Sequence, residues 1–193
     1  RLSGELSGSS WSAAWRAEGT LGLLNIDPPQ ERANDQNSVR TNGHFTKWNV
    51  SASILHSLST RSSLYATISS QFARKNLDSS EKMVLGGIYG VRAYPAGEGL
   101  GDDGRLGSLE WRYRLLPTVQ GVVFFDAGVV DVNHVPFVAG SNIRHLNGYG
   151  FALNTIPLKG LSLKMSVAWR GDNLPVSDKD QSPRAWVQSA YSF

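Results

Sequence analysis

The chain contains no cysteine among its 193 residues, which excludes a disulfide framework and a thiolate metal site. It also lacks any run of about 18 apolar residues, so we expect no membrane-spanning helix. The net charge of +3 is spread along the chain without a basic run, which gives little support to nucleic-acid binding. A transmembrane β-strand needs only about 9–11 residues with every second one apolar, so these absences leave a membrane β-barrel open.

What the sequence does contain is a series of segments in which apolar and polar residues alternate. In residues 161–170, for example, Leu163 and Met165 alternate with Ser162 and Lys164. Alternation with a period of two is typical of β-strands whose two faces meet different surroundings. It predicts about eight strands, at residues 12–24, 45–58, 62–74, 105–116, 118–131, 149–153, 161–170 and 184–193.

The connections between the expected strands alternate in length. Short turns fall at about residues 59–62, 117–120 and 158–160, and long polar links fall at about 25–44, 76–104, 132–144 and 171–183. Short turns at one end of the strands and long loops at the other are typical of an outer-membrane barrel with extracellular long loops. A soluble antiparallel sandwich or barrel is the alternative, and its apolar face would form a buried core.

The longest link, residues 76–104, is rich in glycine and carries one arginine, Arg92, in an apolar and aromatic setting. A connection of roughly 30 residues without secondary structure of its own is unusual in a compact domain and usually has a function. A guanidinium group in such a setting requires a carboxylate partner. We expect that partner to be Asp126, on the inward face of a later strand, or Glu110, on the strand before it. The alternative is that Arg92 is an exposed loop charge.

Other kinds of site find little support. The chain has no GxxxxGK[ST] motif and no helix after the glycines, so a phosphate site is not indicated. The four histidines show no ligand-like spacing, and we interpret Asp102 and Asp103 as a solvated turn rather than as a cation site. No nucleophile can be paired with a base. We therefore expect no enzymatic activity, no cofactor and no metal.

A stretch of about 55 residues carries a family pattern. MVLGGIYGVRAYP, followed by GEGLGDDG, LGSLEWRYRL and VVFFDAGVV, contains Leu-Gly-Gly, Val-Arg-X-Tyr and an Asp-Ala-Gly strand in that order. It resembles the transporter component of two-partner secretion, the ShlB/FhaC/HecB haemolysin secretion/activation family of the Omp85 superfamily. The motif residues are Gly86, Gly87, Val91, Arg92, Ala93 and Tyr94. Ala93 stands where the superfamily usually has glycine. Because alanine tolerates positive φ poorly, we expect a negative φ there or a slightly altered loop tip.

The resemblance implies that the whole chain, residues 1–193, is the C-terminal half of a sixteen-stranded outer-membrane barrel. The long loop would fold into the lumen as a lock, and Arg92 would meet the acid of the Asp-Ala-Gly strand, Asp126. Tyr191 and Phe193 resemble the C-terminal signal by which barrels are recognised for assembly. An eight-stranded barrel is filled by its own side chains, so a loop inside it would require a larger barrel. The alternative is that this chain closes alone and the loop lies outside.

These observations predict an all-β, transmembrane antiparallel barrel in the outer membrane of a Gram-negative bacterium. The chain starts at Arg1 without an initiator methionine, and we interpret it as a mature product or a fragment. The resemblance implies secretion of a partner exoprotein such as a haemolysin or adhesin. The alternatives are an Omp85-type assembly factor that inserts other outer-membrane proteins, and a passive porin or structural barrel. The expected partners are the exoprotein, outer-membrane lipid and the barrel assembly machinery, without nucleic acid.

The two faces of the expected barrel differ in chemistry. The side chains expected to line the lumen are Arg16, Lys47, Arg112, Arg114, Lys164 and Arg170. Those expected on the lipid face, some of them in an interfacial aromatic girdle, are Trp15, Trp48, Trp111, Tyr113, Trp169 and Tyr191.

Overall fold

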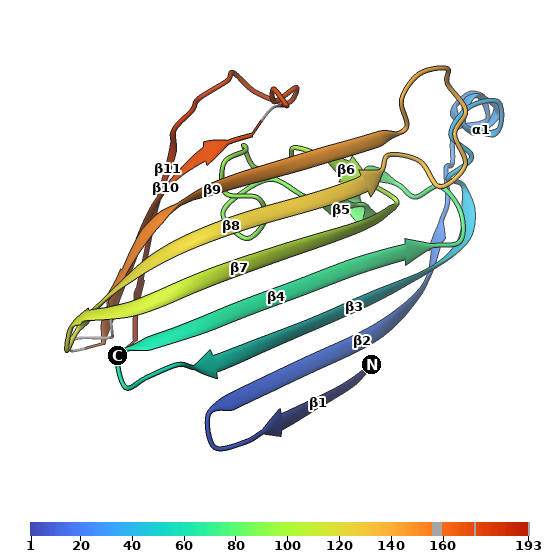
Figure 1. Ribbon diagram of the computed structural model, residues 1–193. Helices are drawn as coiled ribbons and strands as arrows, with labels where there is room; N and C mark the ends of the chain where they lie inside the picture. Colours follow the sequence, from blue (N-terminus) through green and yellow to red (C-terminus); the bar gives the residue numbers. More distant parts are fainter. Residues whose placement is uncertain (156–159, 172, 193) are drawn as a thin grey trace.

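The computed structural model describes residues 1–155, 160–171 and 173–192, and its main feature is a nine-stranded antiparallel sheet (Figure 1). The strands pair in the order β1-β2-β3-β4-β7-β8-β9-β10-β11. Each strand of this sheet therefore pairs with the sheet strands that come before and after it along the chain. They are β1 (Leu2–Ser7), β2 (Trp11–Leu24), β3 (Gly43–Ser57), β4 (Ser62–Ala73), β7 (Asp103–Leu116), β8 (Val119–Asp131), β9 (Ile143–Thr155), β10 (Leu161–Arg170) and β11 (Arg184–Tyr191). The prediction of an all-β antiparallel fold is confirmed.

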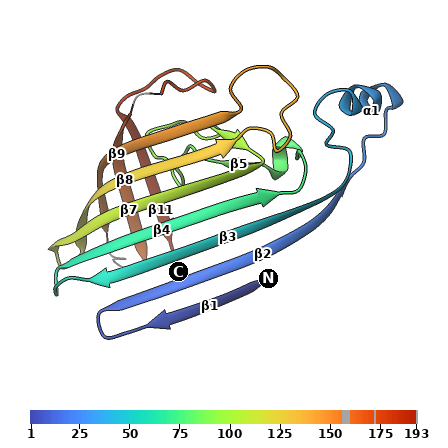
Figure 2. The ribbon, with the colours of Figure 1, turned by 45° about the vertical axis from the view of Figure 1, so that its right-hand side comes forward.

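The sheet is strongly curved and remains open (Figure 2). Within the described part of the chain, β1 and β11 form its two edges and do not pair with each other. The short turns lie together at one end of the strands and the long connections at the other, as the lengths of the links predicted (Figure 1). Because these two edge strands are unpaired with each other, the described residues contradict the alternative in which this chain closes into a barrel by itself.

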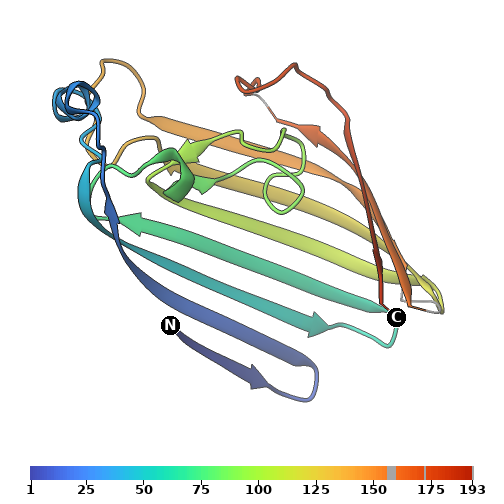
Figure 3. The same cartoon turned by 180° about the vertical axis from the view of Figure 1, so that it is seen from behind.

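The connection between β4 and β7 lies on the concave side of the sheet (Figure 3). It contains a 3-10 turn, η1 (Ser79–Glu81), and two short paired strands, β5 (Met83–Val84) and β6 (Leu100–Gly101). The expectation that this loop has no secondary structure of its own was wrong, because such two-residue pairing leaves no periodic signal. Asp103 and Gly104, which were expected in the loop, already belong to β7.

Two further elements, outside this loop, were not predicted. In β1, Gly4 lies under the indole of Trp15, and a Cβ on this glycine would stand 2.6 Å from the Trp15 Nε1. A glycine at the centre of a short strand interrupts the alternation that would reveal it. The helix α1 (Pro29–Gln36) lies in the connection between β2 and β3 and begins with a proline, whose fixed φ suits the first helical turn. Among the described residues, no helix is long and apolar enough to cross a membrane.

The convex face of the sheet carries exposed apolar side chains on every strand. Trp15, Trp48, Trp111 and Tyr113 are between 36% and 49% exposed there, and Trp169 stacks on Tyr149 with 6.2 Å between the ring centroids. The buried core lies on the opposite side, between the loop and the concave face of the sheet. Its members are Leu85, Val91, Ala93, Tyr94, Val122, Phe124, Val130, Leu146 and Ala168. The soluble-sandwich alternative is contradicted, because the apolar face of these strands is exposed instead of buried.

Candidate functional site

The centre of the candidate site is Arg92, whose side chain reaches from the loop to the concave wall. Its Nε donates to Oδ2 of Asp126 at 2.8 Å, and its Nη2 donates to Oδ1 at 2.8 Å. The backbone N–H of Arg92 donates to the same carboxylate at 3.1 Å. The side chain of Asp126 is only 1% exposed, so this two-pronged ion pair is largely shielded from water. The expected contact between Arg92 and Asp126 is therefore present.

The second expected acid, Glu110, also contacts the arginine. Nη1 of Arg92 donates to Oε1 of Glu110 at 2.8 Å, while the other oxygen of Glu110 accepts from Nε of Arg112 at 2.8 Å. Ser108 donates to Oδ1 of Asp126 at 2.7 Å and accepts from Nη2 of Arg92 at 3.1 Å. Two neighbouring strands, β7 and β8, thus supply both carboxylates and the hydroxyl. The arrangement fits a planar guanidinium and leaves no equivalent geometry for a lysine.

Two aromatic side chains complete the arginine's surroundings. The guanidinium carbon of Arg92 lies 3.4 Å from the ring centroid of Phe124, a cation–π contact. The absence of a side chain at Gly150 makes room for this ring, since a Cβ there would stand 2.6 Å from Phe124 Cζ. From β11, the Trp186 indole N–H donates to the carbonyl oxygen of Arg92 at 2.7 Å. Neither aromatic residue could be predicted from the sequence, because only the fold brings β8 and β11 to the loop.

The glycines of the motif shape the loop tip. Gly87 has a φ of +110°, which favours glycine. The backbone N–H of Val91 donates to the carbonyl oxygen of Leu85 at 2.7 Å and closes the turn. Gly90 lies so close to this turn that a Cβ would stand 1.9 Å from the same oxygen, and a Cβ on Gly86 would meet another carbonyl at 2.4 Å. These close approaches bring Arg92 to the wall from a compact turn.

Ala93 is accommodated without positive φ. Among the described residues, Arg40 is the only non-glycine residue with positive φ, so the expectation of a negative φ at Ala93 is confirmed. Its methyl group packs against Gly148 of β9, where a Cβ would stand 2.5 Å from the Ala93 Cβ. The space left by the missing side chain of Gly148 therefore accommodates the methyl group of Ala93, which stands where the superfamily usually has glycine.

The interpretation of Asp102 and Asp103 as a solvated turn was wrong. Asp103 belongs to β7, where it accepts from the backbone N–H of Ala73 at 2.7 Å. Asp102 is fully buried. Its Oδ1 accepts from the backbone N–H of Leu77 at 3.0 Å and pairs with Lys82 at 2.9 Å. Its Oδ2 accepts from the backbone N–H of His134 at 2.9 Å. A buried carboxylate persists when it is paired and hydrogen-bonded, and here it joins the start and end of the loop to the β8–β9 connection.

A further buried carboxylate, Glu98, ties the loop to the connection between β10 and β11. We call residues 173–183 of that connection the strap. Oε2 of Glu98 accepts from the backbone N–H groups of Val176 and Ser177, both at 2.9 Å, and Oε1 accepts from Arg144 at 2.7 Å. Burial alone would raise the pKa of Glu98, but these hydrogen bonds outweigh it and hold the pKa below its usual range. Glu98 was not among the predicted residues, although an isolated acid between two glycines is a signal in the sequence.

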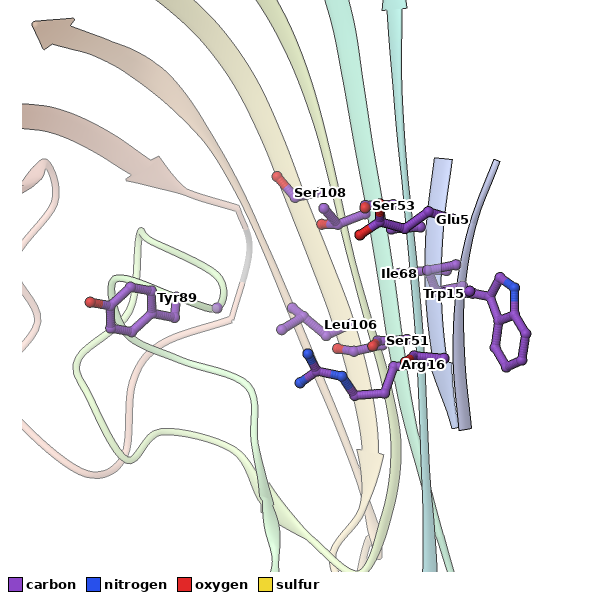
Figure 4. A pocket seen from close by; sticks show the side chains of 16 residues that line it. Glu5, Trp15, Arg16, Ser51, Ser53, Ile68, Tyr89, Leu106 and Ser108 are labelled. Atoms are coloured by element: carbon purple, nitrogen blue, oxygen red, sulfur yellow. The ribbon is translucent and has the colours of Figure 1, made fainter. Parts of the chain in front are cut away.

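The loop tip faces a cavity on the concave side, and Figure 4 shows Tyr89 across from the opposing wall. The cavity measures about 610 Å³, and its wall carries hydroxyl groups and a few charges, among them Ser51, Ser53 and Arg16. Trp15 points away from it towards the convex face (Figure 4). The side chain of Tyr89 is 87% exposed, so the tip of the loop presents an uncovered aromatic ring to a polar space.

Three other residues that were predicted to line the lumen contact the loop, the strap or a smaller cavity. Lys47 pairs with Glu81 of the loop at 2.9 Å, Arg170 pairs with Asp180 of the strap at 2.7 Å, and Lys164 lines a smaller cavity beside the arginine. Tyr191 is exposed at the end of β11. Phe193, the other part of the expected assembly signal, lies outside the described residues.

Substitutions of Asp126 and Glu110 are expected to lower the local stability of the loop by unequal amounts. In a full-length parent protein, Asp126→Asn should cost on the order of 3 kcal/mol of local stability, because it leaves the buried arginine without its two-pronged partner. Glu110→Gln should cost less, since the side chain of Glu110 is 13% exposed and Arg92 keeps Asp126. Hydrogen exchange of residues 85–99 would compare the two variants. Equal loss of protection would contradict the ranking.

Comparison with known proteins gives a consistent picture. A family model described as haemolysin secretion/activation protein ShlB/FhaC/HecB matches residues 5–148. The heme/hemopexin transporter protein HuxB of Haemophilus influenzae (strain 86-028NP) is 34% identical over 181 residues, which cover 90% of this chain and 32% of HuxB. The outer membrane transporter CdiB of Dickeya dadantii (strain 3937) is 27% identical over 142 residues, covering 72% of this chain and 25% of CdiB.

Among solved structures, CdiB from Acinetobacter baumannii has a similar fold. The TM-score is 0.52 at 18% sequence identity, and the match covers 97% of this chain and 39% of that one. The chain thus spans about a third of the length of the curated relatives that it matches most fully.

Proposed function

Since this chain belongs to the ShlB/FhaC/HecB haemolysin secretion/activation family, we propose that it forms part of an outer-membrane transporter that releases a partner exoprotein from a Gram-negative cell. The observation that carries the proposal is the anchoring of a long loop on the concave wall by Arg92 and Asp126. A passive porin or a purely structural barrel gives no reason for a buried ion pair on a loop tip.

The two faces of the sheet suit this role. The convex face would lie in lipid, with its exposed aromatic and aliphatic side chains. The concave face would supply a polar route, since hydroxyl groups such as those of Ser51, Ser53 and Thr67 can bond to many peptide groups without selecting a sequence. The arginine loop would narrow this route as a conformational lock. No ATP is present in the periplasm, so folding of the exoprotein outside the cell would drive its passage.

The proposal also covers partners. The exoprotein would be large and unfolded during passage, the convex face would contact outer-membrane lipid, and the last strand, ending in Tyr191 and Phe193, would be recognised by the barrel assembly machinery. We propose no catalytic activity and no nucleic-acid partner for this chain.

Deletion of the full-length parent gene tests the function directly. We expect one large protein to disappear from the culture supernatant while the other outer-membrane barrels stay at their normal amounts. Proteomic quantification of supernatant and outer membrane from the same cultures would measure both. A parallel fall of many barrels would instead support an assembly factor, and an unchanged supernatant would contradict secretion.

A further inference from the structure

The loop that carries Arg92 is held at a second place, separate from the ion pair. Arg92 is anchored to β7 and β8, whereas Glu98, six residues later, contacts β9 and the strap. Glu98 has no exposed surface, and each of its two carboxylate oxygens accepts at least one hydrogen bond. A buried carboxylate in such surroundings is stable only while its donors stay in place.

The donors to Glu98 come mainly from the strap. Ser177 contributes its backbone N–H at 2.9 Å and its hydroxyl at 2.7 Å, and Val176 contributes a backbone N–H at 2.9 Å. Backbone donors of this kind are available only while the strap keeps its local conformation. The contact therefore couples the shape of the strap to the position of the loop.

A second contact joins the strap to the same loop near the motif. The hydroxyl of Tyr94 donates to the carbonyl oxygen of Asn173 at 2.8 Å, and the Asn173 side chain donates to the carbonyl oxygen of His145 in β9 at 2.8 Å. At its far end the strap is tied to β10 by the two-pronged pair of Arg170 with Asp180, at 2.8 and 2.7 Å. The strap thus lies against the loop and is held to the strands beside it.

We propose that the strap is a retaining cover for the arginine loop and that Glu98 is the positioning residue that joins the two. Arg92 can then leave the wall only after the strap has separated from Glu98. This inference rests on the proposed function for its biological meaning, because a lock that opens during transport must be released at both anchoring places. The geometry itself is independent of whether transport occurs.

The test uses the full-length parent protein in intact cells and two reporters that do not depend on secretion. The first reporter is trypsin cleavage after Lys179, which is exposed in the strap but requires local opening to fit a protease. The second is labelling of a Val91→Cys variant by a membrane-impermeant maleimide. Val91 is fully buried within the loop, and residues 1–193 contain no cysteine, so once any cysteine elsewhere in the parent protein is replaced, labelling reports movement of the loop.

Glu98→Ala should raise both cleavage after Lys179 and labelling at position 91 by about tenfold, because several charge-assisted hydrogen bonds are lost. Glu98→Gln should give a smaller rise, since it keeps the size and an acceptor oxygen. The matched control is Glu81→Ala, which removes a glutamate of the same loop that pairs with Lys47 and does not touch the strap. Lys179→Gln should abolish the cleavage and identify its site.

Three outcomes would overturn the inference. Cleavage that rises without labelling would mean that Glu98 holds the strap but does not position the loop. No change in either reporter would remove the coupling altogether. An equal rise in the Glu81→Ala control would indicate general loosening. Secretion measured in the same cells is a separate test, so loss of secretion with unchanged reporters would bear on the proposed function and not on the strap.

Discussion

Arg92→Ala is expected to reduce release of the exoprotein by at least tenfold while the barrel still inserts into the outer membrane. The substitution removes every side-chain bond from Arg92 to Asp126 and Glu110 and leaves the carboxylate of Asp126 buried without its cation. Breaking a buried pair from one side typically costs about 3–5 kcal/mol, which is enough to free the loop tip from the wall. Exoprotein in the supernatant and heat-modifiable barrel in the membrane would be measured together.

The control for this prediction is Arg61→Ala, which removes an exposed arginine from the turn between β3 and β4, at the opposite end of the strands. It should change neither quantity. Arg92→Lys should resemble Arg92→Ala more than the parent, because an ammonium group cannot form the two parallel bonds to Asp126. If secretion and insertion fell to the same extent in Arg92→Ala, the residue would have only a folding role.

Gly90→Ala adds a single methyl group, and we expect this group to displace Arg92. The added Cβ would stand 1.9 Å from the Leu85 carbonyl oxygen and 2.8 Å from its carbon, and both are backbone atoms that cannot rotate away. The loop must therefore move, and with it Arg92, two residues later. We expect secretion to fall nearly as far as in Arg92→Ala, with hydrogen exchange faster in residues 85–94.

The same substitution at Gly107 is the matched control. A Cβ there would meet only a backbone oxygen, Thr67 O, at 3.6 Å, which is ordinary van der Waals contact. Gly107→Ala should therefore leave both secretion and exchange unchanged. Normal secretion in Gly90→Ala would show that the tight turn is not required to position Arg92.

The strands and the acid partners of Arg92 could be predicted from the sequence because both depend on local pattern. Period-two alternation marks a strand wherever one face is apolar and the other polar, as in β10 and β7. β1 was missed for the same reason, since Gly4 replaces the side chain that would complete its pattern. The partners could be named because Arg92 needs an acid and Asp126 follows the alternation on the inward face.

The contacts that hold the loop could not be predicted in this way. Asp102 looked like half of a solvated turn, yet it is fully buried and joins three segments. Glu98 meets Ser177, a residue 79 positions later, and Trp186 reaches Arg92 across 94 positions. No local pattern encodes such distances. They follow from the curvature of the sheet, which brings β9, β10 and β11 round to the side of the loop opposite β4.

The sequence by itself determined the class of fold, the apolar and polar faces of most strands, and the need of Arg92 for a carboxylate, because each depends on residue type and spacing along one segment. The tertiary structure alone decided that the sheet stays open in this chain and that the core lies under the loop instead of between two sheets. It also decided that the strap contacts the loop at Tyr94 and Glu98. These features depend on which side chains meet in space, and that depends on how nine strands curve together.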